Sequence, residues 1–165
     1  MKENPTEQEM LARMAAYCSA AERCPFDVER KLLAAELSAE ATRRILSRLT
    51  EQNYLDEARF ALSFAGDKLK FNSWGPIRIA HELRQKRISA EQIVNALAAL
   101  GEESCNDVLR QLLQSKIKTL RGDNSRENRF KLIRFASGRG FEYDRINQCL
   151  ARLLKNYEDT DDYMD

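Results

Sequence analysis

Side chains suited to covalent or metal chemistry are few in this sequence of 165 residues. It has four cysteines (Cys18, Cys24, Cys105 and Cys149) and one histidine, His81. No two cysteines have Cys-x-x-Cys spacing, and a zinc site or a cysteine–histidine nucleophile would have to use that one histidine. Gly-rich phosphate loops are also missing. The sequence therefore predicts reduced, mostly buried thiols, no metal, no cofactor and no enzymatic activity.

Basic side chains are the better candidates for function. The net charge is only +1, but residues 68–155 hold 18 Lys and Arg against 9 Asp and Glu, whereas residues 1–67 hold 9 against 12. A cationic surface attracts a polyanion, although solvated helix faces are the alternative interpretation. The candidates for partner or DNA contact are Lys68, Lys70, Trp74, Arg78, Arg84, Lys86, Arg87, Lys116, Lys118, Arg121, Arg129 and Arg134.

Two of the notable side chains have a structural alternative. Trp74 either stacks on a base or partner, or packs over the helix junction that follows it. Arg59 is interpreted as an ion-pair partner of Asp56 or Glu57 rather than as a contact residue. No base-reading motif is evident, so any DNA contact should be independent of base sequence.

The elements that must position these side chains are helices. Apolar residues recur at helical spacing behind capping residues, and no stretch alternates with period two. The longest apolar run is five residues, whereas a membrane span needs about 20. Nine helices and no strands are expected, with starts near Thr6, Pro25, Ser38, Asp56, Pro76, Ser89, Ser104, Asn124 and Asp144.

The helical pattern repeats along the chain. Val28, Ser38 and Leu49 match residues 51 positions later, and Ile79 and Ile93 match residues a further 53 positions on. Chance similarity between amphipathic helices is the alternative. The prediction is an all-α fold of three tandem three-helix repeats that form an elongated, curved body. The expected boundaries are 1–53, 54–102 and 103–156, before an acidic, disordered tail at 157–165 that alternatively covers the basic face.

Three stretches of the chain carry recognisable motifs. They are residues 17–32, residues 54–61 (YLDEARFA) and residues 74–88 (WGPIRIAHELRQKRI). In this order and spacing they resemble the RecX family, bacterial regulators of the RecA recombinase. The chain departs from the family pattern at Cys24, where Ser is usual and caps a helix better. Asn53 and Arg87 stand where Gly is common, and Asn tolerates left-handed backbone better than Arg does.

The resemblance implies a function as well as a fold. It implies a non-enzymatic, cytoplasmic monomer that lodges in the groove of the RecA–DNA filament and binds DNA weakly and non-specifically. Such a protein would modulate, mostly inhibit, recombinase activity in recombination, DNA repair and the SOS response. The residues themselves leave open a second interpretation, a sequence-independent helical-repeat nucleic-acid-binding protein.

Overall fold

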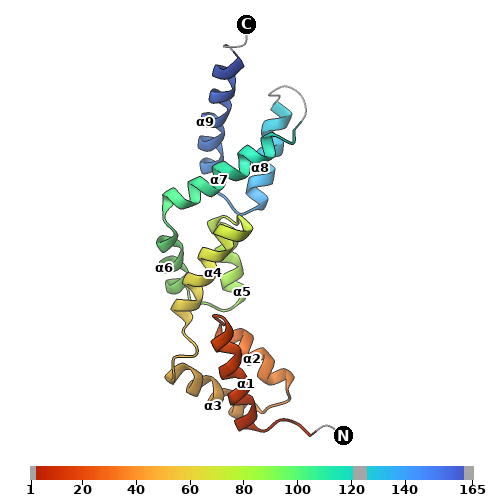
Figure 1. Ribbon diagram of the computed structural model, residues 1–165, viewed down its shortest axis with the longest axis vertical. Helices are drawn as coiled ribbons and strands as arrows, with labels where there is room; N and C mark the ends of the chain where they lie inside the picture. Colours follow the sequence, from red (N-terminus) through yellow and green to blue (C-terminus); the bar gives the residue numbers. More distant parts are fainter. Residues whose placement is uncertain (1–2, 121–125, 162–165) are drawn as a thin grey trace. The chain divides into compact units, whose positions relative to one another are not determined.

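The structure, a computed structural model, describes residues 3–120 and 126–161, with side chains as far as Lys155. These residues form nine α-helices and no strand, as the sequence predicts (Figure 1). The helices are α1 (Glu7–Ala20), α2 (Pro25–Ala34), α3 (Ala39–Glu51), α4 (Glu57–Asn72), α5 (Pro76–Gln85), α6 (Ala90–Leu100), α7 (Glu102–Ile117), α8 (Arg126–Gly138) and α9 (Tyr143–Asp161).

One predicted helix start is wrong. The sequence suggests that Ser104 opens the seventh helix, but α7 begins at Glu102. Gly101 is its N-cap, with a φ of 79° that suits a residue without a side chain. The turn between α6 and α7 is therefore two residues shorter than expected. Asn124, expected to open the eighth helix, lies outside the described residues.

The chain forms two compact units that share the middle helices. Unit 1 consists of Met1–Phe64 and Leu83–Ala96, and unit 2 consists of Ala65–Glu82 and Leu97–Asp165. The helices α4, α5 and α6 each contribute residues to both units. The predicted repeat boundaries and the predicted elongated, curved body stay predictions.

Unit 1 is built around the packing of α1 and α2 on α3 (Figure 1). Met10, Met14 and Cys18 follow one another at four-residue spacing, so all three lie on one face of α1 and are buried. The start of this helix is held by a capping box of Thr6 and Glu9. The buried core of the unit consists of Met10, Met14, Cys18, Val28, Leu32, Ile45, Leu49 and Leu55.

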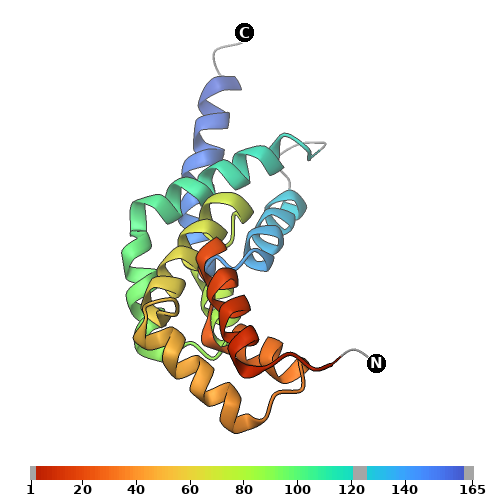
Figure 2. The same cartoon turned by 60° about the horizontal axis from the view of Figure 1, so that its bottom comes forward.

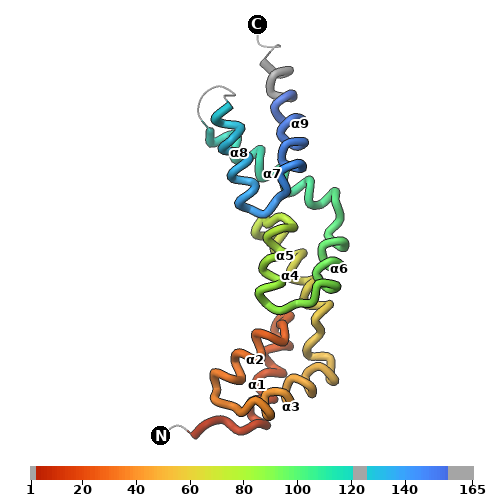
Figure 3. The backbone as a smooth tube through the Cα atoms, turned by 180° about the vertical axis from the view of Figure 1, so that it is seen from behind, coloured from red at the N-terminus to blue at the C-terminus, as the bar shows by residue number. Residues whose placement is uncertain are grey.

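Unit 2 contains α7, α8 and α9, which pack on one another (Figure 2, Figure 3). Its buried core consists of Leu109, Leu113, Leu132, Ala136, Phe141, Ile146, Leu150 and Leu153. The helix α9 runs to Asp161, so residues 157–161 belong to its last turns. Residues 162–165 lie outside the described residues, and a disordered tail stays a prediction for them.

The backbone repeats where α2, α5 and α8 end. Glu36, Arg87 and Gly140 occupy equivalent positions, 51 and then 53 residues apart, and their φ angles are 62°, 57° and 94°. In the Schellman motif a residue with left-handed backbone ends the helix, and the N–H of the next residue donates to a carbonyl in the last helical turn. The three hydrogen bonds of this kind run from Leu37 N–H to Leu32 O, from Ile88 N–H to Leu83 O and from Phe141 N–H to Ala136 O. The helical repetition read from the sequence is thus confirmed.

The predicted departures from the family pattern have visible consequences. Asn53 and Arg87, which stand where glycine was expected, both adopt left-handed backbone, with φ of 61° and 57°. Cys24 precedes α2 without a side-chain capping bond, as its residue type suggests. Among the helices of the described residues, none is long and apolar enough to cross a membrane.

Candidate functional site

The two units divide the predicted contact residues between them. Unit 1 holds Arg84, Lys86 and Arg87, all near the turn between α5 and α6. Unit 2 holds the others, which are Lys68, Lys70, Trp74, Arg78, Lys116, Lys118, Arg129 and Arg134. Arg121 lies outside the described residues.

Unit 2 gathers four cations around two aromatic rings, and we call this group the basic–aromatic cluster. Its members are Lys68, Trp74, Arg78, Lys116, Phe135 and Arg139. The Trp74 ring is shared by two cations, because Arg78 Cζ lies 4.2 Å and Lys68 Nζ 4.8 Å from its centroid. Trp74 therefore lies against its own chain's cations, in line with a packing role.

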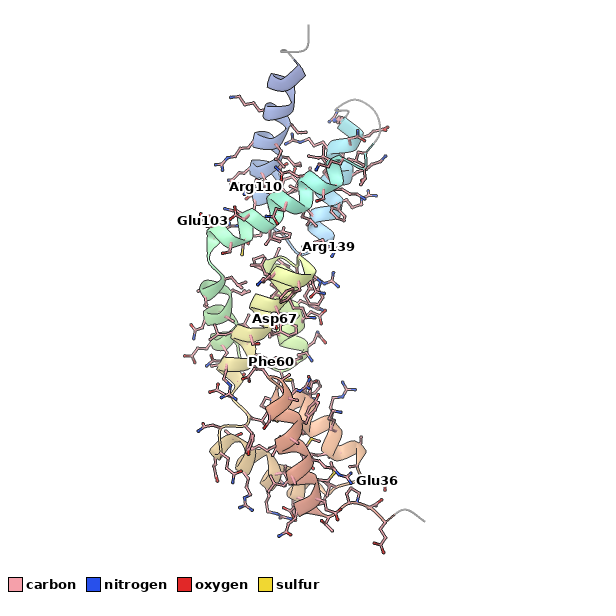
Figure 4. The ribbon with its side chains drawn as sticks, in the orientation of Figure 1. Glu36, Phe60, Asp67, Glu103, Arg110 and Arg139 are labelled. Carbon is pink, nitrogen blue, oxygen red and sulfur yellow. The ribbon has the colours of Figure 1, made fainter. Side chains whose placement is uncertain are left out.

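The second ring of the cluster is Phe135 on α8. Lys116 Nζ lies 4.8 Å and Arg139 Cζ 5.6 Å from its centroid. Arg139, labelled in Figure 4, is also anchored to the end of α4, because its Nη1 donates to the Asn72 carbonyl at 3.1 Å. The predicted contact set does not include Phe135 or Arg139. The repeat offset of 53 residues carries Lys86 onto Arg139 and would have found it.

A close backbone contact joins the two halves of this cluster. Gly75 N–H donates to the Arg139 carbonyl at 2.7 Å, and Ile77 N–H donates to the Gly140 carbonyl at 3.0 Å. A Cβ on Gly75 would lie 2.3 Å from the Gly140 oxygen, and one on Gly140 would lie 2.4 Å from Arg78 Cβ. Only glycines permit this approach. We call the contact of the α5 start with the α8–α9 turn the glycine junction.

Three cations of the cluster keep their positive charge. Among the described residues, Arg78, Lys116 and Arg139 form no ion pair with an acidic side chain. Aromatic faces and a backbone carbonyl orient these cations without neutralising them. Cations held in this way suit a partner with closely spaced anionic groups, such as the phosphates of a nucleic acid.

A second group of arginines lies in unit 2 but is largely neutralised. It lines a hollow of about 370 Å³ between α7 and α9. Arg110 pairs with Asp107 at 2.9 Å, and Arg145 pairs with Glu102 at 3.2 Å. These exposed pairs cancel most of the local charge, so the hollow is a weaker candidate for binding a polyanion.

In unit 1 the predicted contact residues Lys86 and Arg87 are engaged within the chain. Lys86 Nζ lies 2.7 Å from Asp27 Oδ2. Arg87 Cζ lies 4.8 Å from the centroid of the Phe26 ring. Both contacts join the α5–α6 turn to the start of α2, and we call them together the side-chain junction. Arg84 on the preceding turn is exposed.

Arg59 has the structural role predicted for it, but the predicted partner is wrong. Its Nε lies 2.6 Å from Glu22 Oε1 rather than on Asp56 or Glu57. Asp56 and Glu57 instead accept hydrogen bonds from backbone N–H groups. Asp56 Oδ1 accepts the backbone N–H of Arg59 at 3.0 Å, and Glu57 accepts the N–H of Ser89.

The thiols of the described cysteines are free, and Cys18, Cys24 and Cys105 are buried. Burial raises the pKa of all four, and that of Cys24 reaches about 11. A thiol that stays protonated at neutral pH is a poor nucleophile and a poor metal ligand. Within the part of the chain that the structure describes, no three His, Cys, Asp or Glu side chains group as metal ligands.

Comparisons with known proteins match most of the chain. Residues 56–97 fit the family model of the RecX second three-helix domain, and residues 102–150 fit that of the RecX third three-helix domain. The regulatory protein RecX of Prosthecochloris aestuarii is 30% identical over 146 residues, which cover 88% of this chain and 94% of the relative. That of Pelodictyon phaeoclathratiforme is 29% identical, over 82% of this chain and 83% of the relative.

Some relatives are longer, and the fold likeness extends to solved structures. The chain spans 57% of the regulatory protein RecX of Lacticaseibacillus paracasei, with 28% identity. The crystal structure of RecX from Lactobacillus salivarius superposes with a TM-score of 0.80 at 20% identity, over 89% of this chain and 96% of that one. That likeness supports the all-α helical-repeat fold.

Proposed function

The chain belongs to the RecX family of regulatory proteins, and from this premise we propose that it binds a RecA–DNA filament and limits recombinase activity. It would act as a non-enzymatic, cytoplasmic monomer. Family membership supports the regulatory role. The choice of a filament as partner follows from the resemblance, and the basic–aromatic cluster supports a polyanionic target.

The observation that carries this proposal is the cationic surface of unit 2. Arg78, Lys116 and Arg139 have no acidic partner among the described residues, so they can offer their charge to DNA phosphates without first breaking an internal ion pair. Each phosphate contact releases counterions, which makes binding strong at low salt and indifferent to base sequence. A protein held in this way along a filament would obstruct DNA pairing and subunit exchange.

The test adds purified protein to RecA on single-stranded DNA and follows ATP hydrolysis and strand exchange. Wild-type protein should inhibit both at stoichiometric amounts. The triple variant Arg78→Gln, Lys116→Gln and Arg139→Gln should need at least roughly 10-fold more protein, since three charge-assisted contacts are lost.

A control variant with the same loss of charge separates site from net charge. Arg13→Gln, Arg43→Gln and Arg48→Gln remove three exposed arginines of unit 1. This variant should inhibit nearly as wild type does. An equal loss of inhibition in both triple variants would show that overall charge, not the cluster, drives binding. No inhibition by the wild type at stoichiometric amounts would overturn the proposal.

The second candidate function is direct binding of nucleic acid without a recombinase. The cluster favours it, because cations without an acidic partner can contact the phosphates of any single strand. Binding to a fluorescent oligonucleotide over a range of salt should then show a slope that falls by about 2 in the cluster variant, at roughly 0.7 per phosphate contact. If excess free DNA relieved all inhibition of RecA, this second function would replace the first.

A further inference from the structure

The side-chain junction and the glycine junction occupy equivalent places in successive repeats. The offset of 51 residues carries Cys24 and Asp27 onto Gly75 and Arg78. The offset of 53 residues carries Arg87 onto Gly140. In both places the start of one repeat's second helix meets the left-handed turn of the next repeat.

The contacts that close the two junctions differ in kind. The glycine junction is closed by two backbone hydrogen bonds, which contain no charge for a ligand to compete for. The side-chain junction is closed by the Lys86–Asp27 ion pair and the packing of Arg87 on Phe26. The Lys86 and Asp27 side chains are 28% and 29% exposed, so solvent and solutes can reach the pair.

The cations of the side-chain junction are therefore open to competition. A phosphate group can accept the hydrogen bond that Lys86 donates to Asp27. Lys86 cannot hold Asp27 fully while it neutralises a phosphate, whereas Arg87 can add its charge while it stays on the Phe26 ring. Salt screens such partly exposed pairs, so the attraction between Lys86 and Asp27 is weak.

We infer that the side-chain junction is a releasable latch: a polyanion that takes up Lys86 releases Asp27 and loosens the start of α2, while the glycine junction stays closed. The inference rests on the proposed function in one respect, that a nucleic acid is the natural polyanion. It adds a coupling between ligand binding and the contact of the first repeat with the second.

Cys24 is a reporter built into the latch. It immediately precedes α2, lies three residues before Asp27 and is 0% exposed. A buried thiol reacts with an alkylating reagent only when the surrounding structure opens locally. Cys18 lies in the core of the same unit, away from the latch residues in sequence, and serves as the internal control.

The experiment measures the alkylation rate of each cysteine by mass spectrometry, with and without a saturating 30-nucleotide single strand. Binding is followed in parallel by fluorescence anisotropy. In the wild type we expect DNA to accelerate alkylation of Cys24 at least 5-fold and to leave Cys18 unchanged. Lys86→Gln should accelerate Cys24 without DNA and abolish most of the further response.

A matched control is Arg43→Gln, which removes an exposed cation of α3 in the same unit that is not among the predicted contact residues. It should leave the Cys24 rate at the wild-type value, and circular dichroism verifies that every variant is folded. Bound DNA with an unchanged Cys24 rate would overturn the latch and leave the proposed function standing. Absence of DNA and filament binding would overturn the proposed function and the polyanion trigger together. The Lys86→Gln rate would then decide whether the ion pair closes the junction.

Discussion

The glycine junction and the side-chain junction occupy equivalent positions in the repeats but are closed by different kinds of contact. At the glycine junction, Gly75 and Gly140 let two backbones meet with hydrogen bonds of 2.7 and 3.0 Å. At the side-chain junction the equivalent positions are Cys24 and Arg87, and among the described residues no backbone hydrogen bond joins these two segments. Lys86 instead reaches Asp27 through its side chain. The junction with two glycines is thus held by uncharged groups, and the junction without glycine is held by charged groups.

The largest expected effect comes from adding a Cβ to the glycine junction. Gly140→Ala places that atom 2.4 Å from Arg78 Cβ at a residue with φ of 94°. Overpacking and left-handed strain together should lower the free energy of unfolding by roughly 2–5 kcal/mol. Urea denaturation followed by circular dichroism measures it.

The matched control for this prediction is Gly138→Ala. A Cβ there meets nothing within 4 Å and the residue lies in α8, so stability should be unchanged or rise by up to about 1 kcal/mol. Equal destabilisation by the two alanines would mean that the close approach at Gly140 is not what holds the glycine junction.

The next effect in size comes from removing the charge at the side-chain junction. Lys86→Gln leaves Asp27 partly buried without its cation and should cost roughly 1–2 kcal/mol at low salt. The cost should shrink in 0.5 M NaCl, because salt screens the pair in the wild type. The cost of Gly140→Ala should not change with salt, and a parallel decrease for both variants would erase the distinction between the junctions.

The same pair predicts a dependence on pH. Burial opposes the ionisation of Asp27, but its contacts with Lys86 and Cys24 outweigh burial and lower its pKa. A lowered pKa stabilises the fold above the unfolded value of about 3.9, and this contribution is lost as pH falls through the folded value. Asp27→Asn should therefore be less stable than wild type at pH 7, and the difference should vanish in acid. A difference that persists at pH 2 would exclude the ion pair as its source.

The smallest effect concerns the third equivalent position, Glu36 at the end of α2 (Figure 4). Its φ of 62° is strained for a residue with a side chain. Glu36→Gly should raise the free energy of unfolding by about 1 kcal/mol. Arg87→Gly relieves the same strain but removes the contact with Phe26, so it should raise the free energy of unfolding by less. Thermal unfolding compares the two, and an equal gain would mean that the Arg87–Phe26 contact contributes nothing.

Much of the fold could be predicted because its signals are local. The caps of Thr6 on α1 and Ser38 on α3 act over three residues, and both form as the sequence indicates. The capping box predicted for Ser89 and Gln92 forms only in half. Gln92 N–H bonds to Ser89 Oγ, but Ser89 N–H bonds to Glu57 instead. A tertiary neighbour displaced the local partner.

The candidate site was predicted less completely. The excess of cations in residues 68–155 drew attention to the part of the chain that holds the basic–aromatic cluster, yet it ranked Lys86 with Arg78. The structure separates them, because Lys86 has an acidic partner and Arg78 lies on an aromatic face. Arg139 was missed for the same reason, since its anchor is the carbonyl of Asn72 on another helix.

The sequence by itself determined the helices, their caps and their threefold repetition, since each depends on residues within a few positions of one another. Only the tertiary structure decided which cations are neutralised and which remain available. Lys86 and Asp27 are 59 residues apart in the chain, and Arg139 and Asn72 are 67 apart. Charge cancellation depends on distances of a few ångströms in space, and those distances are set by how the helices pack.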